Sequence, residues 1–134
     1  MRFMVMAMTP KDFEAGPPPT AEAFATMQAY NEAAAKAGIL LAAEGLTPPS
    51  KGVRVTFSGD ERIVTDGPYA EAKEVVAGFM IIQMKSLEDA IEWVKRAPNV
   101  NPKVEGHVEI RKLMDVEDFG EGFTPNEEIA KVKY

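Results

Sequence analysis

The chain has 134 residues, of which 46% are hydrophobic and 27% are charged. These fractions are typical of an ordinary globular protein, and the length suits one domain with a modest core. The formal net charge of −6 argues against nucleic acid as a direct partner, because phosphate binding needs a basic surface. The absence of cysteine excludes disulfide bonds, thiolate nucleophiles and cysteine-ligated metals.

Residues 2–8 form a short apolar segment that ends at Thr9 and Pro10. The segment is too short for a signal peptide or for a membrane span of about 20 residues, so we expect a cytoplasmic protein without membrane contact. We predict a strand here. Alternation divides its side chains into two apolar sets, Phe3, Val5 and Ala7 on one face and Met4, Met6 and Met8 on the other. Both faces of this strand should therefore be covered.

Predicted strands and helices alternate along the rest of the chain. Thr20 is expected to cap a helix that ends at Gly38, and Ser86 to cap a second helix that stops before Pro98. The predicted elements after the first strand are, in order, a helix at 20–37, a strand at 39–46, a hairpin of strands 53–57 and 62–65, a strand at 76–84, a helix at 86–97 and a strand at 104–113.

This order predicts an α+β fold of the ferredoxin-like βαββαβ type with a hairpin insertion. Its antiparallel sheet would carry both helices on one face. Residues 2–8 and 76–84 are apolar on both faces, however, and a monomer rarely exposes a large apolar patch. We therefore predict a homodimer that pairs through the sheet face.

The end of the chain has a different character. After residue 114 it is acidic and is interrupted by Gly120 and Gly122. Thr124 resembles an N-cap before a first-turn proline, which predicts a short helix from Asn126 towards the end. We interpret residues 1–114 as the domain and residues 115–134 as a C-terminal arm that packs on the partner.

Residues 64–74 read VTDGPYAEAKE. This stretch resembles the VTDGPFAETKE signature of the YCII-related, DGPF-motif family, with Tyr69 and Ala72 as the differences. Further segments resemble other parts of that family, namely AEGLTPP at 43–49, Gly78-Phe79, SLEDAIEWVKRAP at 86–98, GHVEIR at 106–111 and EDFG at 117–120. The resemblance implies a dimeric α/β-barrel fold, which agrees with the strands that are apolar on both faces.

The resemblance implies less about activity. Some members lie beside or are fused to extracytoplasmic-function sigma factors, and related folds include small monooxygenases, muconolactone isomerase and chlorite-dismutase-like proteins. Enzyme-like members of the wider group carry a histidine–aspartate pair. In this chain only Asp66 matches that pair by position, because the single histidine, His107, lies in the last predicted strand.

The DGP turn offers the first candidate site. Asp66 and Tyr69 would place a carboxylate and a phenol at a pocket mouth, whereas Gly67 and Pro68 are expected to form the turn itself. Asp66 has two readings of equal weight, a turn cap and a catalytic residue.

Cationic residues near this turn suggest an anion site. Arg54, Arg62 and Lys73 would cluster where the hairpin meets the turn and would bind a carboxylate or a phosphate. For Lys73 alone, a solvated surface position is the simpler interpretation.

The last strand and Glu44 supply the remaining candidates. His107, Glu109 and Arg111 share the face without helices. Either His107 and Glu109 form an acid–base pair, with Arg111 as a ligand-binding residue, or, as we favour, the three residues form a polar ladder across the dimer. Glu44 is expected either to be exposed to solvent at the end of its strand or to be buried with a raised pKa.

We expect no metal, because one histidine without cysteine is a poor ligand set, and no cofactor, because nucleotide and dinucleotide motifs are absent. The first hypothesis is a homodimer that binds a small organic ligand, anionic or aromatic, near the DGP turn. If it is an enzyme, Asp66, Glu44 or His107 would carry cofactor-free acid–base chemistry. The alternative is a non-catalytic accessory module linked to sigma-factor-dependent transcription, and the sequence leaves open whether the protein is an enzyme.

Overall fold

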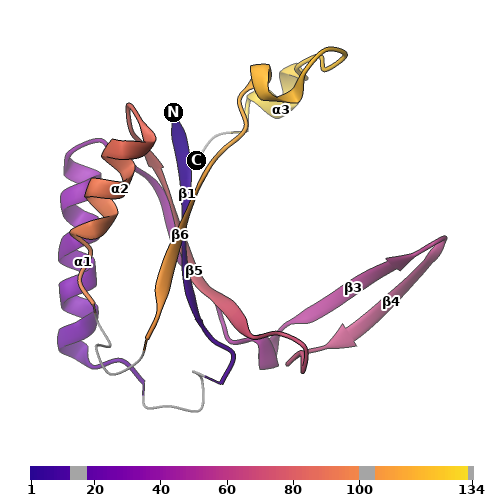
Figure 1. The fold of residues 1–134 in the computed structure, drawn as a ribbon, viewed down its shortest axis with the longest axis horizontal. Coiled ribbons are helices and arrows are strands. Elements are labelled where there is room, and N and C mark those ends of the chain that lie inside the picture. The colour runs from indigo at the N-terminus through magenta and orange to yellow at the C-terminus, as the bar shows by residue number, and fades with distance from the viewer. Residues whose placement is uncertain (13–17, 100–104, 133–134) are drawn as a thin grey trace.

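The computed structural model describes residues 1–12, 18–99 and 105–132 (Figure 1). Its elements are, in chain order, β1 (Arg2–Pro10), α1 (Ala21–Lys36), β2 (Leu40–Gly45), the 3-10 helix η2 (Pro49–Lys51), β3 (Val53–Ser58), β4 (Glu61–Asp66), β5 (Glu74–Gln83), α2 (Leu87–Lys95), β6 (His107–Lys112), the 3-10 helix η3 (Val116–Phe119) and α3 (Glu127–Ala130). Four strands form an antiparallel sheet in the order β2-β5-β1-β6, and β3 and β4 form a separate hairpin. The predicted ferredoxin-like α+β fold is confirmed.

Local capping explains where the two main helices begin. The Thr20 hydroxyl accepts a hydrogen bond from the Ala23 backbone N–H at 3.1 Å, and the Ser86 hydroxyl accepts one from the Asp89 N–H at 3.1 Å. Gly38 follows α1 with a φ of 73°, the left-handed conformation that glycine adopts most readily. Both predicted caps are confirmed.

The ends of other elements differ from the prediction. β1 continues through Thr9 to Pro10, because these residues still pair with Val75 and Glu74 of β5. The C-terminal helix begins at Glu127, so Thr124 is not its cap. Asn126 takes that role, and its side chain accepts hydrogen bonds from the next turn. The turn of 3-10 helix at η3 was not predicted, and residues 100–104, where the last strand was expected to start, lie outside the described residues.

Helices α1 and α2 cover one face of the sheet (Figure 1). The core lies between these layers and centres on Phe3, Val5, Ile82 and Ala90. Phe3 is 1% exposed and Ile82 is 0% exposed. Of the two predicted apolar sets of β1, the one with Phe3 and Val5 packs under the helices, which ties the N-terminal strand to both layers.

The other face of the sheet, which we call the open face, carries no helix in the described part of the chain. Register places the apolar side chains Met4, Met6, Met8, Phe79 and Ile81 at its centre and the polar side chains Glu44, His107, Glu109 and Arg111 towards its two edges. The β3–β4 hairpin and the C-terminal segment with α3 both extend on this side (Figure 1). Of the apolar side chains of this face, Ile81 is buried and the other four are half-buried. The central strands are therefore apolar on both faces, as predicted.

Among the described helices, none combines the length and the apolar character needed to cross a membrane.

Candidate functional site

A cavity of about 400 Å³ lies between the sheet and the two helices. Its floor is formed where Gly45 of β2, Gly78 of β5 and Ala7 of β1 stand side by side in one row across the sheet. Because none of these residues has a side chain beyond Cβ, no side chain of this row fills the space between the sheet and the helices above. We call this space the helix–sheet cavity.

Backbone contacts favour glycine at one position of this floor. A Cβ at Gly78 would lie 3.0 Å from the Glu44 carbonyl oxygen, closer than most real Cβ contacts. Gly45 has no such restriction, because a Cβ there meets nothing within 4 Å. The floor is therefore partly fixed by the tight pairing of β2 and β5.

The cavity walls are mostly apolar, and one polar group in them lacks a partner. Tyr30 is already engaged, since its hydroxyl donates to the Trp93 carbonyl oxygen at 2.9 Å and its ring stacks on the Trp93 ring. Burial raises the pKa of Tyr30. Asn31 also lines the cavity, and its Oδ1 is buried without a hydrogen-bond partner in the described part of the chain.

Glu44 contributes atoms to the cavity wall, but its carboxylate does not project into the cavity. Glu44 pairs with Phe79, and paired residues in a sheet project to the same face, here the open face. Glu44 is exposed at the end of β2, so the first of its two predicted environments is correct. The helix–sheet cavity can therefore hold an apolar molecule, but it contains no acid–base pair among the described residues.

The DGP turn packs closely on the loop before the hairpin. The Gly67 N–H donates to the Gly52 carbonyl oxygen at 3.0 Å, and a Cβ at Gly67 would lie 1.9 Å from the Pro49 carbonyl oxygen. The predicted structural role of Gly67 is explained by this approach. Asp66 is exposed and makes no side-chain hydrogen bond within the described residues, so Gly67 and not an Asp66 cap holds the turn.

Arg54 and Tyr69 meet at the base of the hairpin. The guanidinium lies 3.8 Å from the centre of the Tyr69 ring, and it forms an ion pair with Glu71. This hydrogen-bonded guanidinium lowers the pKa of Glu71. A hollow of about 310 Å³ lies alongside and is lined by Tyr69, Pro68 and Lys11 among others. Arg54 is thus already neutralised by a carboxylate, which weakens its expected role as an anion ligand.

The predicted cluster of Arg54, Arg62 and Lys73 is wrong for Arg62. Its guanidinium donates to the carbonyl oxygens of Gly59 and Glu61 at the tip of the hairpin. In the β3–β4 register, Arg62 stands opposite Phe57, three pairs away from Arg54, which is roughly 10 Å along a strand. Lys73 is exposed just before β5 and stays a candidate, since its side chain has no hydrogen-bond or ion-pair partner among the described residues.

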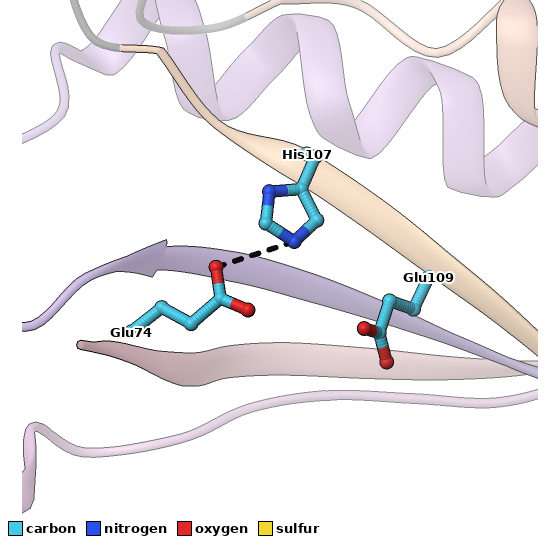
Figure 2. Close-up of side chains that lie close together, drawn as sticks. All are labelled: Glu74, His107 and Glu109. Atoms are coloured by element: carbon cyan, nitrogen blue, oxygen red, sulfur yellow. Dashed lines mark ion pairs between the residues drawn. The ribbon is translucent and has the colours of Figure 1, made fainter. Parts of the chain in front are cut away.

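His107 contacts the carboxylate of Glu74, which lies far from it in the sequence. Its Nε2 lies 3.2 Å from Oε2 of Glu74 at the start of β5, and Glu109 lies on the same face (Figure 2). The ligand atoms of these three exposed side chains all lie within 4.8 Å of one another. Sequence alternation predicted that His107, Glu109 and Arg111 share a face. It could not find Glu74, which is brought near by the register of three strands.

The predicted site residues therefore fall into two groups. Glu44, His107 and Arg111 project from the open face, with Glu44 on one edge strand and the others on the opposite one. Asp66, Tyr69 and Arg54 lie at the base of the hairpin, with Lys73 in the segment that follows. Within one chain these groups do not form a common catalytic centre.

The strand order and the placement of both helices define a ferredoxin-like α+β protein with a small-molecule-sized cavity between its layers. The family model of the YCII-related domain matches residues 1–117, and the chain belongs to this family, as the DGP signature predicted. An uncharacterised protein of Rhizobium meliloti (strain 1021) is 37% identical over 78 residues. That match covers 58% of this chain and 62% of the relative, so the chain spans less than two thirds of the relative's length.

Proposed function

We propose that this protein binds a small, neutral, mainly apolar organic molecule in the helix–sheet cavity and that it does so as a homodimer. The observation that carries the proposal is the cavity itself, with its floor of Gly45, Gly78 and Ala7 beneath two helices. Its volume of about 400 Å³ is in the range of small-molecule sites. Two of the floor residues, Ala7 and Gly45, are exposed, so the cavity is open to an entering ligand.

The lining favours an aromatic ligand with one polar group. Val5, Met27, Met80 and Val94 offer apolar and polarisable contacts. Asn31 lines the cavity, and its buried Oδ1 has no hydrogen-bond partner in the described residues, so it would accept a hydrogen bond from a ligand once its side chain turns towards the cavity. No lysine or arginine of the described chain lines the cavity, and a buried anion would therefore be unpaired. Of the two ligand classes expected from the sequence, the cavity supports the aromatic one.

This cavity supports binding better than catalysis. Acid–base catalysis needs titratable groups within hydrogen-bond reach of a substrate, and the Glu44 carboxylate projects to the opposite face. The remaining candidates, Asp66 and His107, lie on the hairpin and on the open face. We therefore propose that the cavity is a binding site and that any acid–base step belongs to the other face.

A fragment screen by thermal unfolding tests this proposal. Neutral aromatic fragments such as phenol and benzamide should raise the melting temperature of the wild-type protein, because they bind only the folded state. The Ala7→Phe variant should lose this response, since the new ring would occupy the cavity. The matched control Ala29→Phe adds the same ring to an exposed position of α1 that does not line the cavity, and it should keep the response.

A second variant separates loss of binding from loss of folding. Asn31→Leu should weaken phenol and benzamide, which can donate a hydrogen bond, but leave toluene binding nearly unchanged. Equal stabilisation of the wild type and Ala7→Phe would contradict the proposed site.

The open face supports the homodimer. Its apolar centre and polar edges have the arrangement found in protein interfaces. The hairpin and the C-terminal segment flank this face and carry exposed apolar side chains, such as Phe57 at 72% and Ile129 at 71% exposure. A second copy placed on the open face would cover the sheet and these side chains together.

A further inference from the structure

We infer that Glu74, His107 and Glu109 form a binding site for a divalent transition-metal cation. The three side chains project from the open face, and their ligand atoms all lie within 4.8 Å of one another (Figure 2). They supply one imidazole nitrogen and two carboxylates. This site is separate from the helix–sheet cavity, which lies on the other side of the sheet.

The sheet holds the three residues in place. His107 stands opposite Met8 and Glu109 opposite Met6, so the two ligands of β6 project to the same face two residues apart. Glu74 opens β5 opposite Pro10, on the far side of β1. The ligands thus come from two strands that pair with the same central strand, and such elements hold a site more precisely than loops do.

The distances suit coordination after a small adjustment. His107 Nε2 and Glu74 Oε2 are 3.2 Å apart, which is the separation of neighbouring ligands around a metal. Ligand bonds of about 2.0–2.2 Å place such atoms roughly 3.2–3.6 Å apart, so the widest separation must close by about 1–1.5 Å. Rotation of the exposed glutamate side chains can supply this movement.

Charge gives an independent reason to expect a cation. In the described part of the chain, neither Glu74 nor Glu109 forms an ion pair with lysine or arginine. Some carboxylates elsewhere have such partners, for example Glu71 with Arg54 and Asp118 with Lys112, whereas others in the described residues, such as Glu44 and Glu61, have none. Two close carboxylates with only an imidazole between them repel each other, and a bound divalent cation would reverse that repulsion.

The ligand set indicates the class of metal. Imidazole combined with carboxylates suits zinc, manganese, iron(II) or cobalt, whereas magnesium and calcium prefer oxygen ligands alone. Three protein ligands leave coordination positions for water or for a small molecule. Residue types alone predicted no metal, because a count of histidines and cysteines does not reveal that Glu74 lies beside His107.

Cobalt(II) titration of the untagged protein, after dialysis against a chelator, tests the inference. The wild type should bind one cation per chain, with visible absorption bands from the coordinated cobalt. His107→Ala and Glu74→Gln should each weaken binding at least tenfold. The control Glu61→Gln makes the same change at the exposed start of β4, far from the site along the hairpin, and should bind as the wild type does.

The single histidine gives a second readout that does not depend on the variants. Substoichiometric cobalt should first broaden or shift the imidazole NMR signals, all of which belong to His107. Signals that change elsewhere while the imidazole stays unaffected would overturn the inference, as would equal affinity in His107→Ala. No organic ligand enters this experiment, so its failure would leave the proposed cavity function standing.

Discussion

At the scale of single residues, the structure distinguishes the residue that forms the DGP turn, Gly67, from the residue that was a candidate for catalysis there, Asp66. Gly67 is required by the close approach of the Pro49 carbonyl oxygen, whereas Asp66 is exposed and makes no turn-capping hydrogen bond in the described structure. The sequence predicted the structural role of Gly67, because turn chemistry is local. It could not decide the role of Asp66, because that depends on which atoms the folded chain brings near.

Gly67→Ala should be strongly destabilising. The added Cβ would lie 1.9 Å from the Pro49 oxygen, so the turn and the preceding loop must move apart. Overpacking of this kind costs about 1–3 kcal/mol, and urea unfolding measures it. Gly52→Ala is the matched control in the same loop, since its Cβ would meet that oxygen at an ordinary 3.5 Å. Equal unfolding free energies for the two variants would show that the contact is not as close as described.

The same distinction applies to His107. Alternation alone placed His107, Glu109 and Arg111 on one face, and this was correct because a strand has a period of two. The contact with Glu74 depends on the pairing of β1 with both β5 and β6. The sequence alone does not specify which residue of β5 lies beside His107 across β1.

At the scale of elements, the hairpin is tied to the rest of the chain by few contacts at its base. Its strands are exposed throughout, and β3 and β4 pair only with each other in the described structure. The ion pair of Arg54 and Glu71 and the packing of Arg54 on Tyr69 connect the hairpin to the segment before β5. Local turn signals predicted the hairpin correctly, but they could not predict how far it projects from the sheet.

The hairpin base should loosen in acid. The folded state lowers the pKa of Glu71, so this residue contributes stability above the unfolded carboxyl pKa of about 4.3, and the contribution is lost as the pH falls through the lowered value. Glu71→Gln should remove this dependence. Hydrogen exchange of the β3–β4 amides at pH 6 should be faster in the variant, and the difference should shrink as the pH falls below the unfolded carboxyl pKa of about 4.3. A difference that persists in acid would mean that the carboxylate charge does not hold the base.

The helix–sheet cavity also arises between elements. Gly45, Gly78 and Ala7 are ordinary small residues in the sequence, far apart from one another. Only the pairing of β2, β5 and β1 brings them into one row beneath the helices. The fold class could therefore be predicted from periodicity and motifs, but the binding site proposed for it could not.

At the scale of the whole molecule, the sheet has a different role on each face. One face packs against the helices and contains the cavity, and the other presents an apolar centre between the hairpin and the C-terminal segment. The sequence predicted the need for cover on the second face, because apolar residues on both sides of a strand are visible in its pattern. The homodimer that would provide this cover remains our proposal.

Light scattering checks the dimer. The wild type should have twice the mass of one chain at micromolar concentration. Met6→Lys, which places a charge at the centre of the open face, should give a monomer because burying that charge without a partner is costly. Leu87→Lys makes the same kind of change on the exposed surface of α2 and should stay dimeric. A wild-type monomer would refute pairing through the open face.

The most direct test of the proposed function uses methyl NMR of the eight methionines. Met27 and Met80 line the helix–sheet cavity, whereas Met4, Met6 and Met8 lie on the open face. Titration with a neutral aromatic fragment should shift the methyl signals of Met27 and Met80 and leave those of Met4, Met6 and Met8 in place. Shifts confined to the open-face methionines, or none at Met27 and Met80, would contradict the account.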